Sequence, residues 1–263
     1  MTPSLPAPMD VRLMNIVSLL LGLAFVGMLA VLGIGWLVQQ NLFRLAAIKV
    51  RGDVSHNNAV TLRANVLPRL NGNFFTVDLR GAQSAFESVP WVRRAVVQRE
   101  FPNRLSVVLQ EHKAIAYWGR EADAQLVNTH GEVFEANPGD VESEDLPLLS
   151  GPDGQAALVL DAYRRLSPVF EKIDAQIELL ELTSRGSWRT RLDDGATLEL
   201  GHGAMEEIEN RVARFVATLT QVAGKFGKPL ESADLRYGNG YAIKLRGVTT
   251  TVLGDKANAK EKR

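Results

Sequence analysis

The side chains that most often carry out chemistry in enzymes are scattered or missing in this sequence. The 263-residue chain has no cysteine, which excludes a thiol nucleophile, a disulfide framework and a thiolate metal site. Glycine motifs that bind phosphate or present a nucleophile are absent. The histidines have no metal-binding spacing such as HExxH; they are His56, His112, His130 and His202. These residue types indicate no metal, no cofactor and no small-molecule substrate.

Two acidic clusters are the strongest candidates for acid–base chemistry, Val141–Asp145 (VESED) and Met205–Glu209 (MEEIE). A pair of carboxylates can hydrolyse a glycosidic bond, so an envelope enzyme that uses Glu206 and Glu207 is an alternative function. We expect the first cluster in a polar loop and the second in the first turn of a helix. Solvation and the helix dipole explain acidic residues at such places, so we predict that the protein is not an enzyme.

Charge argues against a nucleic-acid-binding protein. The chain has 30 basic and 30 acidic residues, and nucleic-acid binders usually carry a basic excess or stripe. Arg93 and Arg94 lie beside Trp91, but two arginines on the solvent face of a strand are ordinary.

The segment Ala233–Gly247 (ADLRYGNGYAIKLRG) has the pattern of a strand, a turn and a strand. Asn-Gly is the usual sequence of a two-residue hairpin turn, which here would be Asn239-Gly240. That turn would place Leu235 opposite Lys244, and paired residues share one face of a sheet. It would therefore mix apolar and charged side chains on one face.

A three-residue loop, Gly238-Asn239-Gly240, keeps the faces separate. It pairs Tyr237 with Tyr241 and Leu235 with Ile243, which places apolar residues together. A single bulged strand would preserve the faces equally well. We predict the three-residue hairpin.

The last strand of this segment, Tyr241–Arg246, would leave one edge of its sheet unpaired. Charged residues commonly protect such edges, and Lys244 and Arg246 are suited to that role. Alternatively, the edge accepts a strand from a partner, with backbone hydrogen bonds for affinity and alternate side chains for specificity. The residues alone leave both interpretations open.

The elements that position these side chains follow a predicted membrane helix. Between Leu13 and Phe43 no residue is charged, and roughly 20 apolar residues suffice to cross a bilayer. The apolar run is too long for a signal peptide, and Trp36 suits a membrane interface. We predict a tail over 1–14 and a transmembrane helix over 15–38. The few flanking basic residues do not decide its orientation.

Two small α+β modules follow the span. Residues 45–116 have the order strand, helix, helix, strand, strand, which predicts two helices on a three-stranded sheet. Asp78 is suited to cap the second helix.

Residues 117–247 predict a second α+β domain with an antiparallel sheet and an exposed last strand. It contains a hairpin around His130-Gly131 and a second hairpin that pairs Thr190 with Leu198 across Asp193-Asp194-Gly195. Its long last helix could suggest a coiled coil, but core packing suits the short apolar stripe better. Residues 248–263 form a charged tail, in which 249–254 could add a strand.

Several motifs, in this order and behind one span, resemble the FtsQ/DivIB family of bacterial cell-division proteins. They are Pro90–Trp118, Thr129–Phe134 (THGEVF), Leu146–Pro152 (LPLLSGP), Ser187-Trp188 and Asp234–Gly240 (DLRYGNG). The resemblance implies a POTRA domain followed by a β domain, a cytoplasmic N-terminus and periplasmic modules at the division septum. It also implies a non-catalytic role.

The resemblance further implies binding of small bitopic partners, FtsB-like and FtsL-like, by strand addition on the last strand. Other divisome proteins would bind through the POTRA and membrane-proximal region. In this reading the arginines pair with partner carboxylates, and Tyr241 is an aromatic anchor. The implied partner-binding residues are Arg185, Arg236, Tyr237, Asn239, Gly240, Tyr241, Ala242, Ile243 and Lys244.

Overall fold

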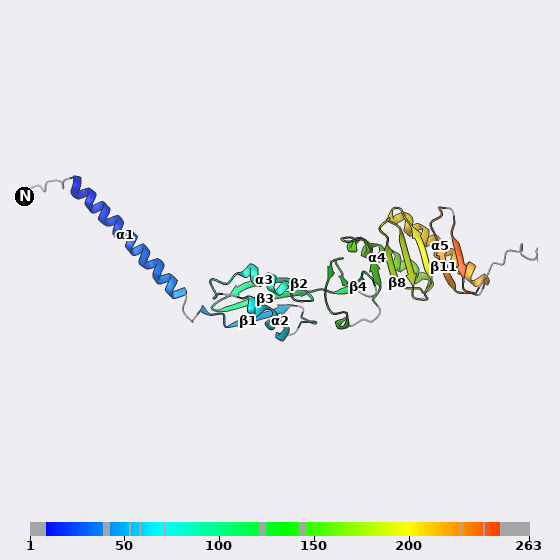
Figure 1. The fold of residues 1–263 in the computed structure, drawn as a ribbon, viewed down its shortest axis with the longest axis horizontal. Coiled ribbons are helices and arrows are strands. Elements are labelled where there is room, and N and C mark those ends of the chain that lie inside the picture. Colours follow the sequence, from blue (N-terminus) through cyan, green and yellow to red (C-terminus); the bar gives the residue numbers. More distant parts are fainter. Residues whose placement is uncertain are drawn as a thin grey trace, which may run out of the picture. The chain divides into compact units, whose positions relative to one another are not determined.

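The structure is a computed structural model of the chain. It divides into two compact units, Met1–Glu111 and His112–Arg263, shown in Figure 1. The residues that the structure describes are 9–38, 43–52, 54–57, 59–70, 72–120, 125–141, 146–226, 228–238 and 240–247. The predicted tail over 248–263, with its possible strand over 249–254, lies outside them.

Helix α1, Met9–Val38, contains the predicted span. Its segment Leu13–Trp36 is long and apolar enough to cross a membrane, and its side chains are exposed. A helix satisfies its backbone hydrogen bonds internally, which the hydrocarbon interior requires.

The first module has the predicted order strand, helix, helix, strand, strand. Its sheet has the order β1-β3-β2, with β1 parallel and β2 antiparallel to β3. The side chain of Asp78 caps α3 by accepting from the Arg80 N–H, as predicted. The elements are β1 Ala47–Gly52, α2 Ala59–Val66, η2 Leu67–Arg69, α3 Leu79–Glu87, β2 Val92–Glu100 and β3 Arg104–Glu111.

A buried carboxylate closes the far end of β3. Glu111 Oε1 accepts from the Asn57 backbone N–H at 3.0 Å and from its side-chain amide at 2.8 Å. Glu111 Oε2 accepts from the His56 backbone N–H at 3.0 Å. These three nitrogen donors hold the loop before α2 against the sheet.

The first module ends earlier than residue 116. The two compact units divide between Glu111 and His112, and β4, Ala114–Trp118, pairs within the second sheet. Apolar alternation continues through this region, so the sequence pattern does not mark the change of sheet.

The second module is built on one nine-stranded sheet with the order β12-β11-β10-β9-β8-β7-β4-β5-β6. Its remaining elements are β5 Gln125–Asn128, β6 Val133–Phe134, η3 Pro138–Asp140, β7 Leu148–Ser150, α4 Ala156–Phe170, η4 Glu171–Ile173, β8 Ile177–Leu182, β9 Trp188–Leu192, β10 Thr197–Gly201, α5 Met205–Phe226, β11 Leu230–Asp234 and β12 Ala242–Leu245.

This sheet is mixed, which corrects the prediction of an antiparallel sheet. Strand β7 is parallel to both β4 and β8, and β10 is parallel to β11. The chain passes through α4 and η4 between β7 and β8, and through α5 between β10 and β11. Parallel neighbours need such a crossover, whereas antiparallel neighbours can be joined by a short turn.

The two helices bury their apolar faces in the core of the second module. Leu166 on α4 and Phe215 on α5 are fully buried in the same cluster, which supports core packing of α5 over a coiled coil. The predicted hairpin across Asp193-Asp194-Gly195 is confirmed, with Thr190 opposite Leu198.

Candidate functional site

Strand β12 is the terminal strand of the nine-stranded sheet, so the prediction of an exposed last strand is confirmed. It pairs with β11 on one side, and no other described strand pairs with its outer edge. Ala242 and Lys244 are exposed, whereas Ile243 packs against the core. Among the described residues, the strand therefore has an unpaired backbone edge beside a buried face.

The predicted register of this hairpin is wrong by two residues. Ile243 lies opposite Ala233 rather than Leu235, and Ala242 lies opposite Asp234. A shift of two residues leaves every side chain on the same face, so the argument from faces cannot distinguish the two registers. Tyr237 and Tyr241 both lie in the connection between β11 and β12, so the predicted pairing between them is absent.

The connection between β11 and β12 runs from Leu235 to Tyr241 and is longer than the predicted loop. Leu235 is buried, and its N–H donates to the Glu199 carbonyl at 2.8 Å. The chain thus stays with β10 after β11 ends. Asn239, within this connection, lies outside the described residues, and Gly240 is exposed.

Hydrogen bonding of the strand identifies which backbone groups face outward. The Arg246 N–H donates to the Pro229 carbonyl at 3.0 Å, on the β11 side. The register shift between Leu230 and Ser232 places the extra residue in β11, so β12 keeps its regular alternation. Backbone groups of successive strand residues point to alternate edges, so those of Lys244 and Ala242 also face β11. Those of Ile243 and Leu245 face the open edge.

Tyr241 points toward α5. Its hydroxyl lies 2.6 Å from the Thr218 Oγ1, and its ring meets Phe215 edge to face with centroids 5.1 Å apart. Tyr237 is 60% exposed and lies in the connection. Of these two tyrosines, Tyr237 has the accessible side chain.

Two of the predicted cationic binding residues, Arg236 and Lys244, form ion pairs with acidic residues of β11. Arg236 donates to Asp234 through two nitrogens, at 2.9 Å from Nε and 2.6 Å from Nη2. These hydrogen bonds lower the pKa of the Asp234 carboxyl below its usual range. Lys244 forms an ion pair with Glu231 on the neighbouring strand.

Arg185 lies in the turn between β8 and β9 and is exposed. Trp188, at the start of β9, lies opposite Gly201 at the end of β10, and a Cβ on Gly201 would be 3.1 Å from the Arg236 side chain. Arg185 and Arg236 therefore lie at the same end of the sheet, separated by β9 and β10.

Three residues that shape this site are not among the predicted binding residues. Asp234 neutralises Arg236, Thr218 bonds Tyr241, and Arg214 Nη1 donates to the Gly238 carbonyl at 3.3 Å. The Asp-x-Arg spacing was a usable signal for the first. The other two lie on α5, and only the folded chain brings them to the connection.

Within the described residues, two carboxylates of the acidic clusters are paired with arginines. Glu207 lies 3.6 Å from Arg211 one helical turn away, and Glu209 lies 2.8 Å from Arg165. Residues 142–145 of the first cluster lie outside the described ranges. No group of three His, Asp or Glu side chains is placed to hold a metal within those ranges.

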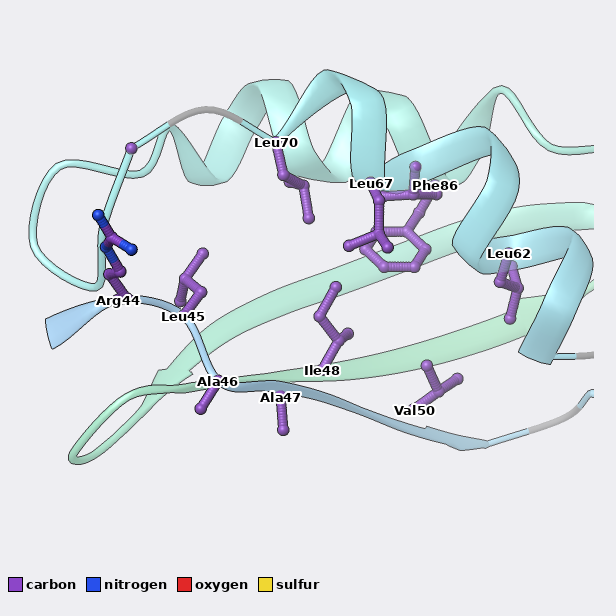
Figure 2. A pocket seen from close by; sticks show the side chains of 12 residues that line it. Arg44, Leu45, Ala46, Ala47, Ile48, Val50, Leu62, Leu67, Leu70 and Phe86 are labelled. Atoms are coloured by element: carbon purple, nitrogen blue, oxygen red, sulfur yellow. The ribbon is translucent and has the colours of Figure 1, made fainter. Parts of the chain in front are cut away.

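The first module has a recess of about 680 Å³ between β1 and the helices. Figure 2 shows apolar side chains of the strand side facing those of the helical side across this recess. Its apolar lining includes Leu45, Ile48, Val50, Leu62, Leu67, Leu70 and Phe86. β1 is also an edge strand of its sheet.

Comparison with known proteins assigns both modules. Residues 43–112 match the family described as POTRA domain, FtsQ-type, and residues 116–236 match Cell division protein FtsQ/DivIB, C-terminal. Relatives named Cell division protein FtsQ extend over nearly the whole chain. The relative from Burkholderia pseudomallei is 41% identical, covering 94% of this chain and 98% of its own length. The relative from Thiomonas arsenitoxydans is 39% identical, covering 95% and 93%. The chain therefore belongs to the FtsQ/DivIB family of cell division proteins.

Proposed function

We propose that the chain is a non-catalytic scaffold of the divisome in the bacterial inner membrane. Helix α1 anchors it, with residues 1–14 in the cytoplasm and both modules in the periplasm at the septum. Family membership and the apolar span support this proposal. We further propose that the chain binds small bitopic partners, FtsB-like and FtsL-like.

The unpaired edge of β12 is the observation that supports this partner binding. The outward N–H and C=O of Ile243 are placed to pair with an extended segment of the FtsB-like partner, which would become the next strand of the sheet. Each such bond has a net value of about 0.5–1.5 kcal/mol. Exposed Ala242 and Lys244 would contact alternate side chains of that segment.

The side chains around the edge have different roles in this proposal. Tyr237 is the accessible aromatic contact, and Tyr241 supports the edge by packing against Phe215 on α5. Arg185 remains a candidate for pairing with a partner carboxylate. Arg236 would have to share its guanidinium with Asp234, because a bidentate ion pair already occupies two of its nitrogens.

Proline at Ile243 tests the edge directly. Ile243→Pro removes an outward N–H without removing a hydrogen bond to β11, and edge strands tolerate proline better than central ones. The matched control, Ile243→Ala, loses the same side chain and keeps the N–H. Ala242→Pro instead removes an N–H that faces β11, and we expect it to disrupt the hairpin itself.

The assay is co-purification of the full chain in detergent with the FtsB-like protein of the same organism. We expect Ile243→Pro to weaken binding about tenfold relative to Ile243→Ala, which corresponds to about 1.4 kcal/mol. Equal binding by these two variants, with β11 and β12 still protected from hydrogen exchange, would exclude strand addition at this edge.

The POTRA recess is the surface on which we propose to test binding of other divisome proteins. Leu67 on η2 is 43% exposed and lines it. Leu67→Glu should weaken co-purification of a POTRA-dependent partner, while FtsB-like binding stays intact. Loss of both interactions together would indicate misfolding instead of a local contact.

A further inference from the structure

Four phenylalanines gather at one end of the POTRA module. Phe43 meets Phe75 with ring centroids 4.9 Å apart, and Phe74 contacts Phe75 at 5.2 Å and Phe101 at 6.3 Å. All three contacts have steep interplanar angles, as edge-to-face packing requires. We call this group the aromatic end.

Three separate segments build the aromatic end. The Phe74 N–H donates to the Phe43 carbonyl at 2.8 Å, and the Ala46 N–H donates to the Asn103 carbonyl at 2.9 Å. These bonds join the chain leaving the span, the loop before α3 and the turn between β2 and β3. Phe43, which accepts the first of these bonds, is also the first described residue after α1.

The outer rings of this group are exposed although the inner one is buried. Phe74 is 6% exposed, whereas Phe75 is 46% and Phe101 is 77% exposed. Large aromatic side chains that adjoin each other on a surface mark an interaction site more strongly than isolated ones.

The exposed loop is held in place by polar contacts. Arg99 Nη2 donates to the carbonyls of Phe75 at 3.3 Å and Val77 at 2.9 Å. The Asn73 side chain accepts from the N–H groups of Phe75 and Thr76, both at 3.0 Å. The outward position of Phe75 is therefore built into an ordered turn.

Exposed cations accompany the exposed rings. Arg44 adjoins Phe43 and is exposed at the entry to β1, where Figure 2 shows it. Arg104 is exposed at the start of β3, opposite the half-buried Glu100. Aromatic rings with neighbouring guanidinium groups suit the headgroup layer of a membrane, which is amphipathic and often anionic.

The covalent tether brings this end of the module to such a layer. Trp36 is the last residue of the apolar segment, and Phe43 follows it by seven residues. Seven extended residues reach at most about 25 Å, so the aromatic end stays within that distance of the end of the span.

We propose that the aromatic end of the POTRA module lies on the lipid surface, with Phe75 and Phe101 among the headgroups and Arg44 and Arg104 paired with anionic lipid phosphates. This contact adds to the anchoring by α1 and is independent of the β12 edge. It limits the orientations that the first module adopts above the bilayer.

A single fluorophore on the full-length chain tests the contact, because the sequence has no cysteine to compete for labelling. Ala46→Cys places the dye beside the aromatic end, and Gln110→Cys places it at the other end of β3. Each protein is reconstituted into phosphatidylcholine vesicles, with or without phosphatidylglycerol. Headgroup-spin-labelled lipid then reports proximity to the surface by quenching the dye.

We expect strong quenching at position 46 and little at position 110. Phe75→Ser with Phe101→Ser should reduce quenching at 46 toward the level at 110. Arg44→Gln with Arg104→Gln should remove the dependence of this quenching on phosphatidylglycerol. The control, Val96→Ser, changes an apolar side chain that is 44% exposed on the middle of β2 and should have no effect.

Unchanged quenching at 46 in the double serine variant would overturn the proposal, because the tether alone would then explain the proximity. Equal quenching at positions 46 and 110, in the labelled proteins without further substitutions, would also overturn the proposal. Phe101→Ser alone provides a variant whose folding is not in question, since that ring is largely exposed.

Discussion

Replacing Tyr241 tests whether this residue supports the β12 edge or contacts the partner directly. Tyr241→Phe removes one hydroxyl, whose bond to Thr218 is worth about 0.5–1.5 kcal/mol. We expect the lower end of that range. Thr218 Oγ1 also lies 2.9 Å from the Arg214 carbonyl, so it keeps a hydrogen-bond partner after the substitution.

Tyr241→Ala removes more. It deletes the edge-to-face contact with the fully buried Phe215, worth about 0.5–1.5 kcal/mol, and the burial of a half-buried ring. With the lost hydroxyl bond, the total is about 2–4 kcal/mol. This loss should open the connection between β11 and β12.

Hydrogen exchange of peptides covering 230–247 measures the local effect, and co-purification with the FtsB-like protein measures binding. We expect Tyr241→Phe to bind normally and Tyr241→Ala to lose both protection and binding. The matched control is Tyr237→Ala, which alters an exposed tyrosine and should weaken binding without changing exchange. If Tyr241→Phe abolishes binding while exchange is unchanged, the hydroxyl contacts the partner and our assignment is wrong.

Three further changes test other parts of the structure. Gly131→Ala should destabilise the second module by about 1–3 kcal/mol in urea unfolding, because φ is +79° and the added Cβ would lie 2.6 Å from a neighbouring backbone carbon. The control is Gly154→Ala, where φ is +77° but the space around the added Cβ is open. It measures the cost of the backbone conformation without the steric clash. Glu111→Ala should lower the stability of the first module by about 1–3 kcal/mol, measured by hydrogen exchange of the loop that its carboxylate holds, since the buried Asn57 N–H and the part-buried His56 N–H lose their acceptor. Arg236→Gln should raise the pKa of Asp234 toward its ordinary value in a carboxyl-carbon NMR titration. Because the folded-state pKa is lowered, the ion pair stabilises the fold above the ordinary carboxyl pKa, and that contribution is lost as the pH falls through the lowered pKa.

Local sequence patterns were sufficient for the apolar N-terminal helix, the order of elements in the first module and the core packing of α5. Each of these depends on a short-range period, because apolar residues recur every two positions in a strand and about every 3.6 in a helix. The register across Asp193-Asp194-Gly195 followed from the same arithmetic. In that hairpin the loop is short, so few registers compete.

The register of the hairpin formed by β11 and β12 could not be predicted from the alternation of residues. Registers that differ by two residues present the same faces, and the choice between them rests on Leu235, which bonds to β10. The parallel pairing of β10 with β11 is likewise a property of the crossover through α5, which residue alternation does not encode.

The candidate site combines both kinds of information. Residue pattern and family resemblance indicated that the final strand has an exposed edge, and they identified the residues around it. Tertiary structure decided which of those residues face outward. Thr218 and Phe215 come from a helix more than twenty positions earlier and hold Tyr241 inward, while Asp234 satisfies Arg236. Contacts between distant segments exist only in the folded chain, so no local pattern contains them.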